Sequence, residues 1–199
     1  MSGTNHVRNG VWAEEQINEH VHVINSIYVD IPLLLSIAQR IVQTFQASGK
    51  LYIIGNGGSA ADAQHWAAEL SGRFYIDRKS LPAFALTPNS SQVTAIANDF
   101  AFDEIFSRPL SGFLLPDDMV IAISTSGNSK NVINALKLTK SLNVRSVGFT
   151  GPTGGHMKQY CDECLCISSH DVARIQEAHE LCGHIVCSIV EKEIFGDEQ

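Results

Sequence analysis

Three features that would assign this chain to a large functional class are missing. No Lys/Arg-rich run occurs in the 199 residues and the formal net charge is −7, so nothing indicates nonspecific nucleic-acid binding. No uninterrupted apolar run approaches the roughly 20 residues needed to span a bilayer. The polar N-terminus, "MSGTNHVRNGVW", lacks the apolar segment of a signal peptide. We therefore expect a cytoplasmic protein that binds neither membranes nor nucleic acid.

The cysteines are few and do not form a recognisable framework. Their number, five, is odd, which argues against a complete set of disulfides. The pair Cys161 and Cys164, in "CDEC", resembles a metal or redox pair, but no second pair completes a zinc site. Cys166 lies in "ECLCIS", which alternates like a buried strand, and Cys182 and Cys187 fit a late helix as small core residues. We interpret all five as structural thiols in a reducing compartment.

The apolar pattern predicts an α/β fold. Residues 12–29 and 31–48 have helical spacing, with Pro32 in the first turn of the second helix and Gly49 at its stop. Five apolar segments then alternate with helical ones: "KLYIIG", "PAFAL", "DMVIAIS", "VRSVGFT" and "ECLCIS". Parallel strands need crossover connections, so this alternation predicts a five-stranded parallel sheet flanked by helices. We expect one domain over 1–199, with helices in 1–49 that pack on it or on another subunit.

Ligands of such sheets lie beyond the carboxyl ends of the strands, and the loop after the first strand is rich in glycine. Gly55, Gly57 and Ala60 match the dinucleotide pattern G-x-G-x-x-G/A, but the next strand ends in "ALTPNSS", without the acidic residue that this pattern requires. A phosphate group fits better. Gly57 and Gly58 allow close backbone approach, and Ser59 and Asp62 are spaced like a capping box at a helix N-terminus. For this loop alone, a tight turn without a ligand is equally compatible.

A second loop favours the phosphate interpretation. The segment "STSGNS" also follows a strand and opens a helix, and its hydroxyls belong to Ser124, Thr125, Ser126 and Ser129. Serines that only cap and turn account for one or two hydroxyls, not four. Because G-K-[ST] is absent, a P-loop nucleoside triphosphatase is disfavoured. We expect a phosphomonoester on a small molecule.

Titratable side chains gather on two helices. His65 and Glu69 share a face of the helix that begins near Ser59, because they are i,i+4. On the last helix, "ARIQEAHELCGHIVC", we attribute Glu177 and Glu180 to a solvated polar face. His184 precedes an apolar run that enters the core, so it needs a partner or a chemical task; a hydrogen-bonded core histidine is the simpler alternative.

Four motifs together resemble a known family. "GNGGSAADAQHWAAELSGRF", "NDFAFDEIFSR", "AISTSGNSKNV" and "RIQEAHELCGH" are similar to the sugar isomerase (SIS) domain family, and within it to the phosphoheptose isomerases. The resemblance spans residues 55–187. It implies a flavodoxin-like SIS domain that forms a homotetramer with active sites between subunits. It also implies conversion of sedoheptulose 7-phosphate to D-glycero-D-manno-heptose 7-phosphate, the first step of ADP-heptose synthesis for lipopolysaccharide.

The resemblance also implies roles for individual residues. Glu69 and His184 are the acid/base pair, and the Zn²⁺ ligands are His65, Glu69, Gln176 and His184. Substrate-binding positions are Asn56, Gly57, Gly58, Ser59, Arg73, Asn98, Asp99, Ser124, Thr125, Ser126, Ser129 and Gln176. One departure is Ala173, where some relatives have Asp, so no role is transferred to it.

Helix geometry conflicts with part of this ligand set. Gln176 and His184 are eight residues apart, roughly 12 Å along a straight helix, whereas zinc ligands lie about 2 Å from the ion. We expect side chains from more than one chain, a distorted helix, or one residue that does not bind the ion directly.

Two other functions remain open. Some SIS proteins bind a replication initiator without catalysis, but those depart from the pattern at Glu69 and His184. Phosphosugar-sensing regulators usually carry a DNA-binding domain, and the first roughly 50 residues here have no basic patch.

Overall fold

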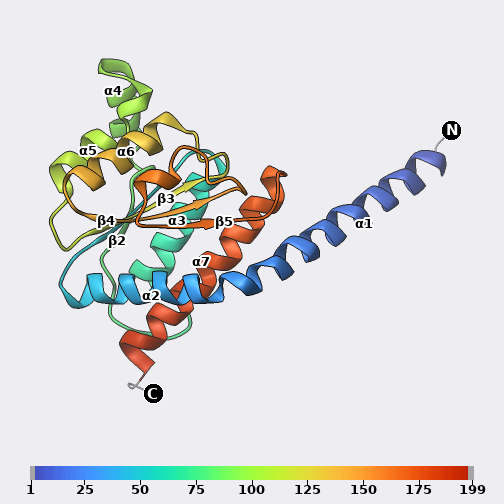
Figure 1. Cartoon of the computed structure of the whole chain (residues 1–199), viewed down its shortest axis with the longest axis horizontal. Helices are drawn as coiled ribbons and strands as arrows, with labels where there is room; N and C mark the ends of the chain where they lie inside the picture. The colour runs from blue at the N-terminus through green and yellow to red at the C-terminus, as the bar shows by residue number, and fades with distance from the viewer. Residues whose placement is uncertain (1–2, 197–199) are drawn as a thin grey trace.

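The computed structural model describes residues 3–196, and it has a parallel sheet between two layers of helices (Figure 1). The strands are β1 (Leu51–Gly55), β2 (Ala83–Ala85), β3 (Met119–Ser124), β4 (Arg145–Thr150) and β5 (Glu163–Cys166). Their order is β2-β1-β3-β4-β5, and all neighbours are parallel. The predicted five-stranded parallel sheet is therefore confirmed. Its edge strand β2 is shorter than the predicted "PAFAL".

Seven α-helices and three short 3₁₀ turns make up the helical part of residues 3–196. The helices are α1 (Gly3–Ser26), α2 (Ile31–Gln46), α3 (Gly58–Ser71), α4 (Ser90–Asp99), α5 (Ser107–Phe113), α6 (Lys130–Ser141) and α7 (Val172–Phe195). The 3₁₀ turns are η1 (Ile27–Asp30), η2 (Phe102–Glu104) and η3 (Lys158–Tyr160).

Successive strand residues point to opposite sides of the sheet and so enter two separate cores. Ile53 packs with buried residues of α2, α3 and α7, whereas its neighbour Ile54 packs with buried residues of α5 and α6. This two-sided burial explains why the central strands are continuous apolar segments. It also places α3 and α7 in the same layer, which matters for the site.

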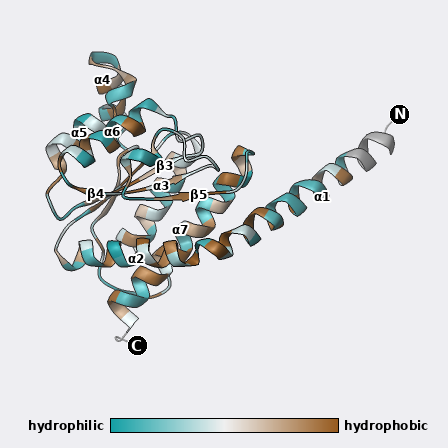
Figure 2. Cartoon of the chain, viewed as in Figure 1, coloured by the Kyte–Doolittle hydropathy of each residue, from teal (hydrophilic) through white to brown (hydrophobic). Residues whose placement is uncertain are grey.

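Helix α1 extends away from the rest of the molecule (Figure 1). It begins earlier than predicted, and polar contacts tie its second half to α7. The Arg174 guanidinium donates to Gln16 Oε1 at 2.7 Å, and His20 Nδ1 lies 2.8 Å from a Glu177 carboxylate oxygen. The apolar residues Trp12 and Ile17 are each 63% exposed along this helix, which carries apolar positions over much of its length (Figure 2).

A search for uninterrupted apolar runs does not detect one helical segment whose average hydropathy is high. The helical segment Asn9–Gln46 is long and apolar enough to cross a membrane by length and composition, with a window of mean hydropathy 1.6. The uninterrupted runs are short, but the average is high. Only 28% of that window is buried, so the segment is not mostly a core helix, although Leu34, Ile37 and Ile41 of α2 are buried against the sheet layer.

Candidate active site

The two predicted phosphate loops lie together at the topological switch point, where the strand order reverses between β1 and β3. After β1 the chain moves to one side to form β2, and it then returns past β1 to form β3 on the other side. Gly55 pairs with Ile123 near the carboxyl ends of β1 and β3, so the loops that follow lie at the same edge. This is the position at which open α/β sheets bind ligands.

Side-chain amides join the two loops. Asn56 and Asn131 exchange two hydrogen bonds, each 2.9 Å long. Gly57 has φ +56°, a conformation that favours glycine, and α3 begins directly after it. Our capping prediction for Ser59 was wrong: Gly57 is the N-cap residue and Ser59 lies buried inside the first turn. The unpaired N–H groups of that turn remain a suitable anion site.

The serine loop, residues 124–129, is fixed by backbone hydrogen bonds from the loop that follows β4. The Ser124 and Ser129 hydroxyls lie 3.1 Å apart, and the Ser126 hydroxyl accepts from the Asn128 N–H at 3.1 Å. The N–H of Gly151 donates to the Thr125 carbonyl, and that of Met157 donates to the Gly127 carbonyl, both at 2.9 Å. These contacts fix the backbone of the loop, and its serine hydroxyls lie beside the N-terminus of the helix that follows.

A histidine–carboxylate cluster lies between α3 and α7. His65 Nε2 is 3.1 Å from Glu69 Oε1, while His65 Nδ1 contacts Glu180 Oε1. The same Glu180 oxygen is 3.4 Å from His184 Nε2, and the rings of His65 and His184 are 4.9 Å apart at 86°. One ligand atom each of His65, Glu180 and His184 lie within 4.8 Å of one another. The donor chemistry of this cluster fits Zn²⁺.

Glu180 and Glu177 were therefore misinterpreted as a solvated face. Glu180 belongs to the cluster, whereas Glu177 forms ion pairs with Arg174 of α7 and with His20 of α1. The signal for Glu180 was present in the sequence. It is i,i+4 from both Gln176 and His184, so the three share one face of α7.

Close packing of the two helices brings the cluster together. A Cβ at Gly183 would lie within 3.0 Å of the Trp66 indole, so glycine is required for this approach. Trp66 is 2% exposed, and its Nε1–H donates to Glu180 Oε2 at 2.9 Å. The indole therefore holds the Glu180 carboxylate against His65.

The cluster is rich in negative charge. Burial and, to a smaller extent, the nearby Glu180 carboxylate raise the pKa of Asp62 to about 6, although His65 opposes the shift. Asp62 Oδ2 is buried and has no hydrogen-bond partner among the described residues. Three carboxyl groups around His65 make this part of the site favourable for a cation.

A buried ion pair fixes the loop after α3. Glu191 accepts hydrogen bonds from the backbone N–H groups of Phe74, Tyr75 and Ile76 and from Arg78 Nε. Phe74 in turn lies with its ring 5.8 Å from that of His184. The exposed Arg73, a predicted substrate residue, precedes this anchored stretch.

The remaining predicted residues lie elsewhere. The Gln176 side-chain amide packs against Gly58 at the glycine loop, so α7, which is continuous, places it at the phosphate end. Asn98 Nδ2 donates to Asp99 Oδ1 at 2.9 Å on exposed α4. Within the described part of the chain, no hydrogen bond or ion pair joins Arg73, Asn98 or Asp99 to the histidine cluster.

Known proteins share this architecture. The sequence profile of the SIS domain matches residues 32–151. A phosphoheptose isomerase from Roseiflexus sp. is 46% identical over 92% of this chain and 94% of its own, and one from Clostridium acetobutylicum is 45% identical over 93% and 96%. The structure of the phosphoheptose isomerase from Neisseria gonorrhoeae matches with a TM-score of 0.86 and 34% identity, over 94% of this chain and 99% of that one. A five-stranded parallel sheet, two linked loops at its switch point and these likenesses lead to one conclusion: the chain belongs to the SIS-domain family and, within it, to the phosphoheptose isomerases.

Proposed function

We propose that this protein is a cytoplasmic isomerase that converts sedoheptulose 7-phosphate to D-glycero-D-manno-heptose 7-phosphate, at the start of ADP-heptose synthesis. The observation that carries the proposal is the arrangement of α3. Its first turn belongs to the glycine loop, and His65 lies seven residues after Gly58, roughly 10 Å along the axis. In the substrate, the phosphate and the carbonyl lie near opposite ends of a seven-carbon chain. One helix can therefore hold both.

The phosphate is assigned to the two loops. Hydroxyls of Ser124, Ser126 and Ser129 and the N–H groups at the start of α3 surround it without a lysine. Gln176 packs on Gly58 and is placed to contact the substrate near this end. Binding energy from the phosphate then positions the reacting carbons at the cluster.

The proton transfers are assigned to Glu69 and His184. Isomerisation moves a proton between adjacent carbons and another between the two oxygens, which requires a base near the carbons and an acid near the oxygen. Both side chains lie around His65 and are partly accessible, with 22% of Glu69 and 36% of His184 exposed. We assign Glu69 as the base and His184 as the acid.

Zinc is part of the proposal. We assign His65 Nε2, Glu69 Oε1 and His184 as its ligands, because the first two atoms lie 3.1 Å apart and the two histidine rings 4.9 Å apart. The alternative carboxylate is Glu180, whose ligand atom lies within 4.8 Å of those of both histidines, and Gln176 lies at the opposite end of its helix face. Bound Zn²⁺ would act as a Lewis acid toward the substrate carbonyl. A carboxylate that binds zinc is a weaker base, so Glu69 cannot easily do both. A base or a zinc ligand from another subunit would remove this conflict.

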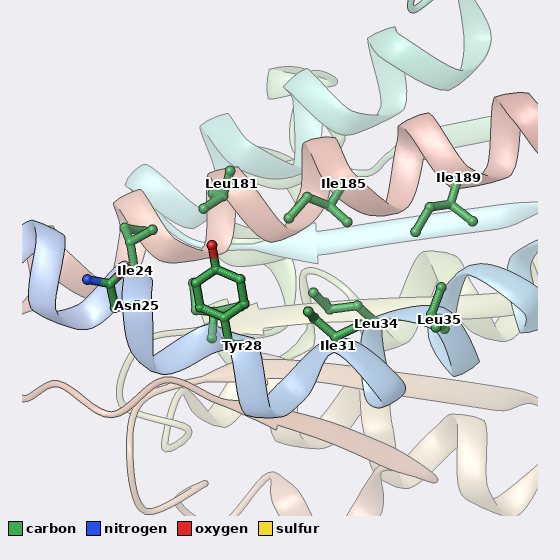
Figure 3. Close-up of a pocket in the computed structure, with 10 residues that line it drawn as sticks. Ile24, Asn25, Tyr28, Ile31, Leu34, Leu35, Leu181, Ile185 and Ile189 are labelled. Atoms are coloured by element: carbon green, nitrogen blue, oxygen red, sulfur yellow. The ribbon is translucent and has the colours of Figure 1, made fainter.

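Assembly into a homotetramer completes the proposal. An apolar pocket of about 350 Å³ lies between the α1–α2 junction and α7, lined among others by Tyr28, Ile31 and Ile185 (Figure 3). Tyr28 and Val29 are 71% and 81% exposed beside it. Together with the exposed apolar positions of α1, this surface is suited to helices of a second copy of the chain.

The proposal is tested with purified protein and sedoheptulose 7-phosphate, following aldose formation with and without added zinc. Glu69→Gln and His184→Ala are expected to lower turnover at least 100-fold. Glu193→Gln, which removes a charge from an exposed position of α7, is the control and is expected to keep full activity. Absence of turnover by the wild type in both conditions would contradict the heptose isomerase function. Full activity of both site variants would contradict only the residue assignment.

A further inference from the structure

Two carboxylates flank the imidazole of His65, one at each ring nitrogen. Nε2 lies 3.1 Å from Glu69 Oε1, and Nδ1 contacts Glu180 Oε1. A neutral imidazole has one N–H donor and one lone pair. Only one of the two carboxylates can therefore accept a hydrogen bond from it, and the other faces the lone pair.

Glu180 is the carboxylate with a fixed orientation. Its Oε2 accepts the Trp66 Nε1–H at 2.9 Å, and Trp66 is buried against Phe149, with ring centroids 5.0 Å apart. Because an indole N–H only donates, Oε2 must accept, and this directs Oε1 to His65 Nδ1. By contrast, the only polar contact of the Glu69 carboxylate within residues 9–196 is His65 itself.

We propose that Glu180 is a positioning residue that keeps the proton of His65 on Nδ1 and so directs the Nε2 lone pair toward Glu69. The inference rests on the proposed function, because it concerns how His65 is prepared for the metal. Two ligand atoms of a tetrahedral ion with bonds of about 2.0 Å lie roughly 3.3 Å apart, and Nε2 and Glu69 Oε1 are 3.1 Å apart. A carboxylate on the second nitrogen is the usual companion of a metal-binding histidine.

The same Glu180 oxygen serves His65 rather than His184. Its distance to His184 Nε2 is 3.4 Å, longer than the usual 2.7–3.2 Å or so of an N–H···O bond. His184 also packs against Phe74 on its other side. Glu180 therefore acts on the metal site through the tautomer of His65.

The isosteric variant Glu180→Gln gives an unusually specific expectation. Trp66 can only donate, so the new amide oxygen faces Trp66 and the NH₂ group faces His65 Nδ1. Nδ1 then becomes the acceptor, and the proton moves to Nε2. Magic-angle-spinning ¹⁵N spectra of the metal-free, histidine-labelled protein, recorded about two units above the ordinary histidine pKa, are expected to show Nδ1–H in the wild type and Nε2–H in Glu180→Gln. The variant His65→Asn assigns the signals.

Metal affinity provides a second readout that does not depend on activity. Competition with a chromophoric chelator is expected to show zinc affinity about 10- to 100-fold lower in Glu180→Gln. The double variant Trp66→Phe/Glu180→Gln frees the amide to turn its oxygen to His65, which restores the Nδ1–H form. Glu177→Gln removes the same charge from the same helix, but its carboxylate contacts Arg174 and His20, so the His65 spectrum is expected to stay unchanged.

Two results would overturn the inference. One is an Nδ1–H signal that persists in Glu180→Gln. The other is a loss of zinc affinity in that variant without any change of tautomer, because Glu180 would then be a ligand itself. Failure of the wild type to isomerise the heptose phosphate, with both tautomer results as expected, would refute the proposed function and leave the role of Glu180 intact.

Discussion

Replacing Gly183 with alanine tests whether the close approach of α3 and α7 holds the site together. A Cβ at this position would lie within 3.0 Å of Trp66, whereas carbon atoms pack best at about 3.5–4.0 Å. Trp66 is 2% exposed and already packed on Phe149, and the cavity that it shares with Gly183 is only about 10 Å³, too small to take the indole. The helices must separate, or the indole must rotate away from Glu180.

The expected loss in the free energy of unfolding follows from these two responses. Overpacking of a tight core costs about 1–3 kcal/mol, and loss of the Trp66–Glu180 hydrogen bond, which has a charged acceptor, adds about 1.5–3 kcal/mol if it breaks. We expect Gly183→Ala to be less stable by about 1–3 kcal/mol if only the helices separate, and by about 2.5–6 kcal/mol if the hydrogen bond also breaks. For a chain of this size each kcal/mol lowers the melting temperature by about 2–4 °C, so the melting temperature is expected to fall by roughly 2–12 °C in the first case and roughly 5–24 °C in the second.

The fall in melting temperature is measured by thermal unfolding, monitored with circular dichroism. The protein concentration is kept fixed, because assembly of subunits shifts the midpoint. Gly112→Ala in α5 is the matched control: nothing lies within 4 Å of its added Cβ, so it is expected to be neutral or up to about 1 kcal/mol more stable. The Trp66→Leu/Gly183→Ala variant is expected to be more stable than the sum of the single changes by about 1–3 kcal/mol. A Gly183→Ala protein that melts together with the wild type would refute the close-packing argument.

Three further changes probe other parts of the molecule. Glu191→Gln leaves the fully buried Arg78 side chain without its counter-charge, so the free energy of unfolding in urea is expected to fall by about 3–5 kcal/mol; a fall below 1 kcal/mol or so would contradict a buried pair. Burial lowers the pKa of His179 to about 4, against the opposing effect of the Thr150 carbonyl. The unfolded chain therefore binds this proton more readily, and stability is lost as the pH falls from about 6.5 to 4, by at most about 3 kcal/mol. His179→Gln should remove that part of the pH dependence in urea titrations, and an unchanged slope would show that other groups cause it. Tyr28→Asp places a charge beside the apolar pocket and is expected to lower the sedimentation coefficient if a second copy covers that surface, whereas an unchanged value would exclude this pocket from the interface.

The strands were predictable because parallel strands are buried on both faces. Segments such as "DMVIAIS" are continuously apolar and end in polar loops, which few other structures explain. Boundaries were less accessible. α1 begins at Gly3, although apolar periodicity starts near Trp12. β2 is limited to Ala83–Ala85, since as an edge strand it pairs on one side only.

The site was predictable loop by loop, but its central contact was not. The glycine and serine loops have local signatures, and their proximity follows from strand order. The only local signal for Glu180 is its i,i+4 spacing from Gln176 and His184, and a glutamate in a polar stretch of helix is usually solvated. Its role depends on Gly183 and Trp66, which belong to different helices and meet only after the sheet has formed. The wrong cap at Ser59 has a similar cause, because the helix began one residue earlier at Gly58.

The continuous helix α7 excludes the distorted-helix explanation for the distance between Gln176 and His184, and the other two explanations stay predictions. Gln176, Glu180 and His184 follow one another at intervals of four residues along one face of a continuous helix, which runs beside α3. Gln176 lies against the glycine loop, whereas His184 lies against His65, so the two ends of this row match the two ends of α3. Under the proposed function, a substrate extended alongside the two helices would contact Gln176 near its phosphate and His184 near its carbonyl. The residue between them, Glu180, then has no need to touch the substrate, because its carboxylate is already engaged by Trp66 and His65.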